Sequence, residues 1–226
     1  MNRSLAVLFD LDGTLIDTID FILASVRHTF ADRARGPSDA DWIAGIGTPL
    51  RTQLAAYADG VADLDGLVER YRQHQRAHHD EMTRCYAGVR EALQEIREGG
   101  HRVGVVTSKL AEPAARAIRH VGIDDLVDVL VGADDCERHK PDPEPVLRAL
   151  ARLDAVPGEA LFVGDSPHDI AAGNSAGVFT AAVLWGACSR EALAAARPDR
   201  VIASVHELPA VVQALAQALA RTPPVR

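Results

Sequence analysis

The sequence predicts an α/β protein, with a Rossmann-like doubly wound parallel sheet core and an inserted all-helical domain. Beyond Gly88, short apolar runs alternate with amphipathic segments, which is typical of a parallel sheet with helices on both faces. Between residues 17 and 86 the pattern indicates helices and loops, and no strand is predicted there. We therefore expect an α/β core domain of residues 1–16 and 87–226, interrupted by a helical domain of residues 17–86.

The first predicted strand is the apolar run of residues 5–9, which delivers Asp10 and Asp12 to its carboxyl end. Ligands bind at that end of the strands in open α/β sheets, so two acids there indicate a metal or phosphate site. The pair Asp12-Gly13 is also a hairpin turn signal, with residues 14–16 as a return strand. From this stretch alone, both interpretations remain open.

Helices separated by breaks are predicted for the insertion. Asp17 or Thr18 can begin the first helix, because apolar residues then follow at helical spacing. The Gly-Pro pair at residues 36–37 interrupts the pattern, and Ser38 begins it again. A last helix runs toward Met82.

The core is predicted to continue as alternating helices and strands. Glycines end several of these segments, as expected for helix C-termini. The predicted helices cover residues 89–98, 112–120, 145–153, 170–176 and 207–220. The predicted strands cover residues 102–107, 127–131, 160–164, 178–184 and 201–202. The tail from Arg221 to Arg226 is expected to fray.

Composition favours a protein that acts on small molecules. The formal net charge is -8, and no basic block is long enough to indicate a nucleic-acid or anionic-membrane surface. The cysteines Cys85, Cys136 and Cys188 lie far apart, which argues against a zinc site or a disulfide framework. The first apolar run is too short for a signal peptide or a membrane span. We therefore expect a cytoplasmic protein with no membrane or nucleic-acid partner.

Polar residues follow two further strands of the predicted core. Thr107 and Ser108 follow one strand and could hold an anion near a helix start, although helix capping is the simpler interpretation. Asp165 and Asp169 follow another strand, and the alternative is again capping, with Asp165 or Ser166 beginning a helix. The functional interpretation of these residues is favoured only when they are considered together with the acids that follow the first strand.

Lysine is rare in this chain, which otherwise uses arginine. Lys109 and Lys140 are its two lysines. A compact ammonium group meets a single phosphate oxygen differently from a guanidinium, so Lys140, in the pair Lys140-Pro141, is a candidate for a specific role. The alternative is a solvated lysine in a charged loop.

Taken in order, four short motifs resemble those of the haloacid dehalogenase-like hydrolase superfamily. They are the segments at residues 10–14, 107–108, 140–141 and 164–169. The resemblance covers the whole chain, because the insertion resembles the cap that this superfamily places between its first two motifs. The four motifs in this order strongly disfavour the hairpin interpretation of Asp12-Gly13.

The resemblance implies distinct roles for the two acids of the first motif. Asp10 would be the nucleophile that attacks phosphorus and forms an aspartyl phosphate. Asp12 would be the general acid that protonates the leaving oxygen and then the base that activates water. An acid at position 12 favours a phosphatase over a dehalogenase, because a halide leaving group needs no proton.

The resemblance also implies a Mg²⁺ cofactor. Asp10, the main-chain carbonyl of Asp12 and Asp165 would bind the ion, and Asp169 would ligate through water or orient Asp165. Lys140, as a catalytic residue, would neutralise phosphoryl oxygens together with Thr107 and the Ser108 amide.

Substrate choice in this superfamily rests with the cap. Residues 45–51 resemble the cap loop of phosphoglycolate phosphatases and of related pyrophosphatases. Arg51 is the candidate for a substrate's carboxylate or second phosphate, and a surface salt bridge is its alternative. His74, His78 and His79 near Asp80 could hold a metal on a helix face, but a solvated helix is the favoured interpretation.

The expected function is Mg²⁺-dependent hydrolysis of small phosphomonoesters, with phosphoglycolate as the leading substrate. Pyrophosphatase and nucleotide or sugar phosphatase activities are close alternatives. A phosphomutase and a non-catalytic phosphate-binding relative are weaker ones. The expected partner is a small phosphorylated metabolite, and the sequence predicts no oligomeric state.

Overall fold

A six-stranded parallel sheet forms the centre of the computed structural model, which describes residues 4–221. Its order is β5-β4-β1-β6-β7-β8, and every neighbouring pair is parallel, so the predicted fold class is confirmed. The winding reverses at β1, so the carboxyl ends of β4, β1 and β6 meet at a switch point. The strands are β1 (Ala6–Phe9), β4 (Arg102–Val106), β5 (Val129–Val131), β6 (Ala160–Gly164), β7 (Phe179–Val183) and β8 (Arg200–Ile202).

Helices cover both faces of this sheet, and strand β1 contributes to both layers. Val7 and Phe9 pack in one apolar cluster with helices α5 (Val89–Glu98), α6 (Ala111–His120) and α10 (Leu208–Arg221). Ala6 and Leu8 pack in a second apolar cluster with α7 (Glu144–Arg152) and α8 (Pro167–Ala176).

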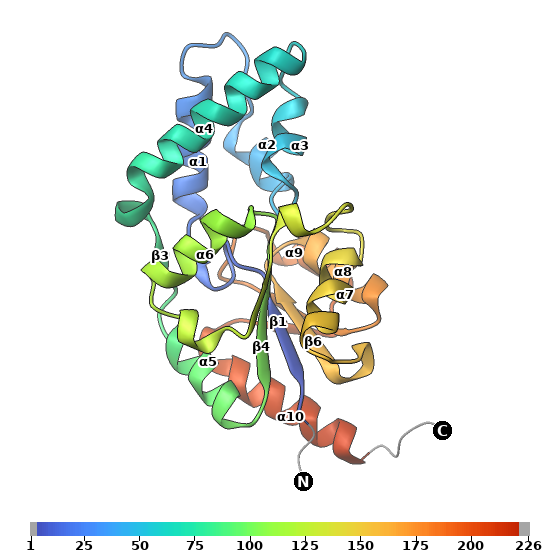
Figure 1. Ribbon diagram of the computed structural model, residues 1–226. Coiled ribbons are helices and arrows are strands. Elements are labelled where there is room, and N and C mark those ends of the chain that lie inside the picture. Colours follow the sequence, from blue (N-terminus) through green and yellow to red (C-terminus); the bar gives the residue numbers. More distant parts are fainter. Residues whose placement is uncertain (1–3, 222–226) are drawn as a thin grey trace.

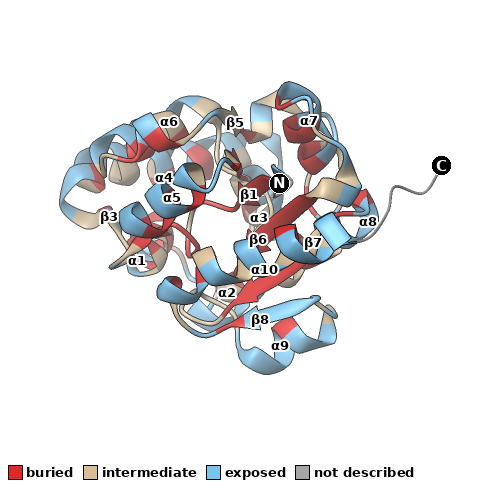
Figure 2. Ribbon diagram, turned by 90° about the horizontal axis from the view of Figure 1, so that it is seen from below, coloured by how far each residue is buried: buried red, intermediate tan, exposed pale blue. Residues whose placement is uncertain are grey.

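Figure 2 shows buried central strands between helices whose outer faces are exposed, whereas the edge strand β8 is largely exposed. Burying each large apolar side chain contributes about 1.5–3 kcal/mol, so β1 is firmly anchored.

Four helices between the first and second core strands form what we call the cap: α1 (Ile19–Phe30), α2 (Asp39–Ala44), α3 (Leu50–Ala55) and α4 (Val61–Met82). They stand together above the carboxyl edge of the sheet (Figure 1). The cap has an apolar cluster of its own, which includes Trp42 and Tyr71. Ser38 begins α2 through a capping box with Asp41. This separate cluster supports the proposed division into core and insertion.

Two short strands were not predicted. β2 (Ile16–Asp17) and β3 (Arg84–Cys85) pair antiparallel where the chain leaves and re-enters the core. Two residues per strand are too few to show a period, which is why sequence patterning missed β3. The hairpin interpretation is wrong, because Ile16 pairs with Cys85 while β1 pairs with β4 and β6.

Helix α9 (Arg190–Ala195) was also not predicted. It is six residues long and buries only Leu193, so it shows no helical period. Ser189 caps it by accepting a hydrogen bond from the Ala192 amide. Short 3₁₀ segments cover Asp124–Leu126, Ala133–Asp135, Pro157–Glu159 and Val205–Glu207.

Two further expectations concern the C-terminal tail and a membrane-spanning helix. The tail predicted to fray begins at Arg221, and the part of it beyond Arg221 lies outside the described residues. Among residues 4–221, no helix combines the length and the apolar character needed to cross a bilayer.

Candidate active site

The ends of three adjacent strands bring the predicted polar residues together. Asp10 follows β1, Thr107 follows β4 and Asp165 follows β6. The Asp10 amide donates to the Val163 carbonyl and the Thr107 amide to the Val131 carbonyl, both over 2.9 Å, so the strand ladders continue to these positions. All three side chains are buried. Three of the four motifs therefore converge on the carboxyl end of β1.

Lys140 reaches this point from the loop that precedes α7. Its Nζ lies 2.6 Å from Oδ1 of Asp10 and 2.6 Å from Oδ1 of Asp169. Burial by itself lowers the pKa of Lys140, but Asp10 and Asp169 outweigh it and raise that pKa above its usual range. The ammonium group therefore stays charged, and the solvated-loop interpretation of Lys140 is wrong.

Three buried carboxylates surround this ammonium group. Oxygens of Asp10, Asp165 and Asp169 lie within 4.8 Å of one another. Burial, followed by the charge of Asp169, raises the pKa of Asp165 to about 7. Burial also raises the pKa of Asp10, against the opposing effect of Lys140. When all three carboxyls are ionised, one ammonium leaves this cluster with an excess of negative charge, and its oxygen donors suit a hard divalent cation such as Mg²⁺.

Neighbouring groups hold Asp165 in place. Thr14 Oγ1 donates to its Oδ1 over 3.2 Å, and the Ala187 amide donates to its Oδ2 over 2.8 Å. Gly13 has a φ of +86°, and a Cβ there would lie 2.3 Å from Asp165 Oδ2. The glycine of the first motif is therefore needed both for the turn and for the close approach of Asp165.

Both carboxylate oxygens of Asp169 accept hydrogen bonds. Oδ1 accepts from Lys140, and Oδ2 accepts from the amide and the hydroxyl of Ser166 over 3.1 Å and 2.6 Å. Ser166 is the N-cap of α8 and forms a capping box with Asp169. The capping interpretation is thus correct for this pair, and the same contacts also aim the Asp169 carboxylate at Lys140.

Asp12 has different surroundings from Asp10. Its Oδ1 accepts hydrogen bonds from Thr18 Oγ1 over 2.6 Å and from Lys109 Nζ over 2.7 Å. Sequence reasoning assigned neither Thr18 nor Lys109 to the site. The rarity of lysine was a usable signal for Lys109, whereas Thr18 looks like any residue at a helix start.

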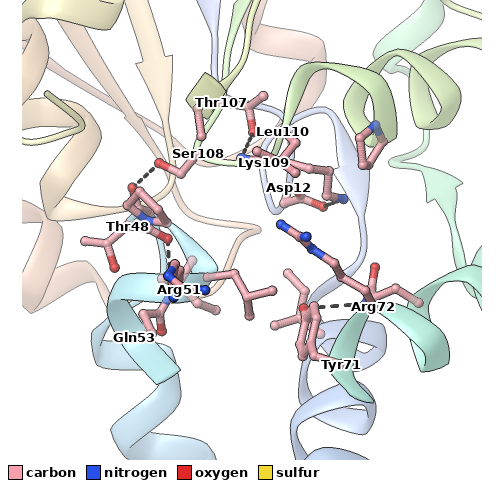
Figure 3. Close-up of a pocket in the computed structure, with 18 of the residues that line it drawn as sticks. Asp12, Thr48, Arg51, Gln53, Tyr71, Arg72, Thr107, Ser108, Lys109 and Leu110 are labelled. Atoms are coloured by element: carbon pink, nitrogen blue, oxygen red, sulfur yellow. Dashed lines mark hydrogen bonds and ion pairs between the residues drawn. The ribbon is translucent and has the colours of Figure 1, made fainter. Parts of the chain in front are cut away.

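A pocket of about 460 Å³ lies between the core and the cap. Asp10, Asp12 and Thr107 line it from the core (Figure 3 labels Asp12 and Thr107). The Ser108 hydroxyl donates to the Gly47 carbonyl over 2.5 Å and so ties the cap loop to the core. This volume is typical of a pocket for a small metabolite.

Arg51 lines this pocket, but its guanidinium already has a partner. Nη1 lies 2.6 Å from Oδ1 of Asp65, and the Arg51 side chain is 53% exposed. The surface salt bridge that was an alternative for Arg51 is therefore present. A substrate anion would have to compete with Asp65 for this guanidinium.

The histidines of α4 are not uniformly solvated. His79 is buried, so the solvated-helix interpretation is wrong for this residue. Its Nδ1 lies 2.6 Å from Asp80 Oδ1, and His120 lies close enough to complete a possible metal-ligating group. Arg116 already neutralises Asp80 over 2.8 Å, which disfavours a second cation there.

Comparisons with known proteins agree with this geometry. A family model for haloacid dehalogenase-like hydrolases matches residues 7–183. Pyrophosphatase PpaX from Bacillus velezensis is 38% identical over 207 residues, covering 91% of this chain and 95% of the relative.

Solved structures share the fold at lower sequence identity. A predicted phosphoglycolate phosphatase from Haemophilus somnus superimposes with a TM-score of 0.85 at 23% identity, covering 94% of this chain and 100% of that one. A β-phosphoglucomutase from Clostridium difficile superimposes with a TM-score of 0.84 at 19% identity, covering 96% and 99%. At these identities the structures establish the fold and leave the substrate open.

Proposed function

This chain belongs to the haloacid dehalogenase-like hydrolase family and is a phosphatase, and we propose that it hydrolyses inorganic pyrophosphate with the help of Mg²⁺. The cationic lining of the pocket carries the proposal, since five arginine or lysine side chains line it. The buried Lys140 adds a further charge beside Asp10. Pyrophosphate carries a second phosphate that needs such charges. The name of the 38% identical relative supports the same substrate.

Phosphoglycolate, the leading expectation from sequence, becomes the second candidate. Its leaving group carries a carboxylate, which the same cations would also attract. The predicted phosphoglycolate phosphatase from Haemophilus somnus is only 23% identical and supports the fold alone. Sugar and nucleoside phosphates suit the pocket less well, because their leaving hydroxyls carry no charge.

The proposed reaction proceeds in two displacements. A carboxylate oxygen of Asp10 attacks phosphorus, the bond to the leaving phosphate oxygen breaks, and Asp12 gives its proton to that oxygen. Water then attacks the aspartyl phosphate, Asp12 takes a proton from this water, and Asp10 is regenerated as phosphate leaves. The separate environments of Asp10 and Asp12 suit these different roles.

Positioning of the transferred phosphoryl group is assigned to three residues. Lys140 touches Asp10 directly and would balance charge on the phosphoryl oxygens beside it. Thr107 and the amide of Ser108, at the end of the neighbouring strand, would bind further phosphoryl oxygens.

Asp10, Asp165 and the main-chain carbonyl of Asp12 would hold Mg²⁺, and Asp169 would act through water or through orientation. When bound, the ion supplies charge neutralisation and fixes the orientation of the phosphoryl group. The excess negative charge of the buried cluster supports this assignment.

A substrate panel tests the proposal. Purified protein with Mg²⁺ would be assayed on pyrophosphate, phosphoglycolate and glucose 1-phosphate, with Asp10→Asn as the inactive reference. We expect the highest kcat/KM for pyrophosphate and no turnover by Asp10→Asn. Turnover retained in Asp10→Asn would refute the mechanism, whereas a preference for phosphoglycolate would move that substrate to first place.

Two further outcomes of the panel would point elsewhere in the family. Transfer of phosphate to a sugar phosphate, without release of free phosphate, would identify a mutase. Mg²⁺ binding without turnover of any phosphate ester would identify a non-catalytic relative.

A further inference from the structure

One of the five exposed or partly exposed cations that line the pocket differs from the others. Four of them already have a carboxylate partner within 2.8 Å: Lys109 with Asp12, Arg51 with Asp65, Arg76 with Glu69 and Arg116 with Asp80. The Arg72 side chain makes no ion pair and no hydrogen bond within residues 4–221. Its charge is therefore available to a ligand without breaking an existing pair.

The position of Arg72 follows from the packing of its helix. The preceding residue, Tyr71, is buried in the apolar cluster of the cap and stacks on Trp42 with ring centroids 6.4 Å apart. This packing fixes the rotation of α4. Figure 3 shows the Arg72 side chain extending from α4 into the pocket, toward Asp12.

We propose that Arg72 is a specificity residue that binds the anionic leaving group of the substrate. This inference rests on the proposed function, in which Asp12 protonates the leaving oxygen. That oxygen must then lie beside Asp12, so the rest of the leaving group extends into the pocket toward Arg72. A guanidinium there can bind a phosphate or a carboxylate through two hydrogen bonds.

Lys109 strengthens the same argument from the core side. Its Nζ is 2.7 Å from Oδ1 of Asp12, so it also borders the place where the leaving oxygen would lie. Lys109 is already paired with Asp12, whereas Arg72 has no such competing partner among the residues that the structure describes. The chemical class selected by Arg72 is therefore a leaving group with its own negative charge, such as phosphate or a small carboxylate.

The test compares substrates with charged and uncharged leaving groups. Pyrophosphate and phosphoglycolate carry an anion on the leaving group, whereas phenyl phosphate presents an apolar ring. Kinetics would be measured for wild type, Arg72→Met and Arg72→Lys. We expect Arg72→Met to lower the ratio of kcat/KM for pyrophosphate over phenyl phosphate roughly 10- to 100-fold, the effect of one charge-assisted contact. Arg72→Lys should recover part of this ratio.

Arg70→Met is the matched control. Arg70 belongs to the same helix, but it pairs with Asp32 over 3.1 Å and does not line the pocket. The substitution removes the same charge from α4, so we expect it to leave the substrate ratio unchanged. If Arg70→Met and Arg72→Met lowered the ratio of kcat/KM values equally, the effect would come from long-range charge rather than from contact with the leaving group. That result would overturn the inference. Melting temperatures of both variants would establish that they are folded.

The outcomes separate the inference from the proposed function. If wild type hydrolyses pyrophosphate but Arg72→Met keeps the wild-type ratio, the inference fails and the function stands. If wild type prefers phosphoglycolate over both other substrates and Arg72→Met removes that preference over phenyl phosphate, the inference stands and the pyrophosphate assignment fails. A wild-type enzyme with no preference for anionic leaving groups would overturn the inference.

Discussion

Lys140 Nζ donates a hydrogen bond to Oδ1 of Asp10 over 2.6 Å, although 130 residues separate the two in the chain. Their side chains are 1% and 7% exposed. Two opposite charges removed from water in this way hold each other strongly, because either one alone would be an uncompensated buried charge. This contact also places the proposed nucleophile beside the proposed phosphate-binding ammonium group.

Removal of the Lys140 ammonium should therefore destabilise the metal-free protein. We expect Lys140→Met to lower the free energy of unfolding by about 3–5 kcal/mol, as found when one partner of a buried ion pair is lost. Urea denaturation measures this change. Mg²⁺ should restore part of it, because the ion supplies positive charge to the same carboxylates.

The other lysine offers a control for this prediction. Lys109 pairs with Asp12 at a more exposed position, with side chains 19% and 14% exposed. Lys109→Met should therefore cost less stability than Lys140→Met. Equal stability of Lys140→Met and wild type without metal would contradict the buried ion pair.

Stabilisation by Mg²⁺ should require the carboxylate of Asp165 but not that of Asp12. We expect Mg²⁺ to raise the melting temperature of the wild-type protein relative to protein in chelator, because a ligand that binds the folded state stabilises it. Asp165→Asn should lose this increase. Asp12→Asn should keep it while losing turnover, because the Asp12 side chain accepts from Thr18 and Lys109 rather than belonging to the carboxylate cluster. An increase that survives in Asp165→Asn would place the ion elsewhere.

Thr18 should act as a positioning residue for Asp12. Its hydroxyl donates to Asp12 Oδ1 over 2.6 Å at the start of α1. Thr18→Val keeps the shape and removes this donor, so we expect kcat to fall roughly tenfold while KM changes less. Thr18→Ser should retain most of the wild-type kcat. Steady-state kinetics on pyrophosphate decide the point, and an unchanged kcat in Thr18→Val would remove Thr18 from the mechanism.

Glu144 should contribute stability that depends on pH. It accepts backbone hydrogen bonds from Glu137 and Arg138 over 3.1 Å and 3.0 Å, and these bonds lower its pKa to about 2. A lowered pKa in the folded state means that the contribution is present above the unfolded pKa of about 4.3 and is lost as pH falls toward 2. These contacts order the loop that leads to Lys140.

Melting temperatures of wild type and Glu144→Gln between pH 7 and pH 2 test this dependence. We expect the variant to melt lower at pH 7, and the difference to shrink as pH falls below about 4.3, where the unfolded carboxyl takes up a proton. A difference that stays constant across this range would show that the charge of Glu144 does not stabilise the loop.

Local sequence patterns determined most of the secondary structure of this protein. The alternation of apolar runs with amphipathic segments predicted the parallel sheet, because burial on both faces requires it. Those same runs located the strand ends at Asp10, Thr107 and Asp165, and capping chemistry located a helix start at Ser38. Such signals act within a few residues and can be read from sequence. The strands β2 and β3 and helix α9 were missed because each is too short to show a period.

Only the tertiary structure decided which of these residues meet. Residues far apart in the chain meet through the packing of the whole sheet and cap, as in the contact of Lys140 with Asp10 and that of Lys109 with Asp12. Periodicity carries no information about such distances. The same holds for Arg72, which sequence patterning did not single out. The packing of Tyr71 directs it into the pocket, and the lack of a carboxylate partner in the described part of the chain sets it apart from the four neighbouring cations.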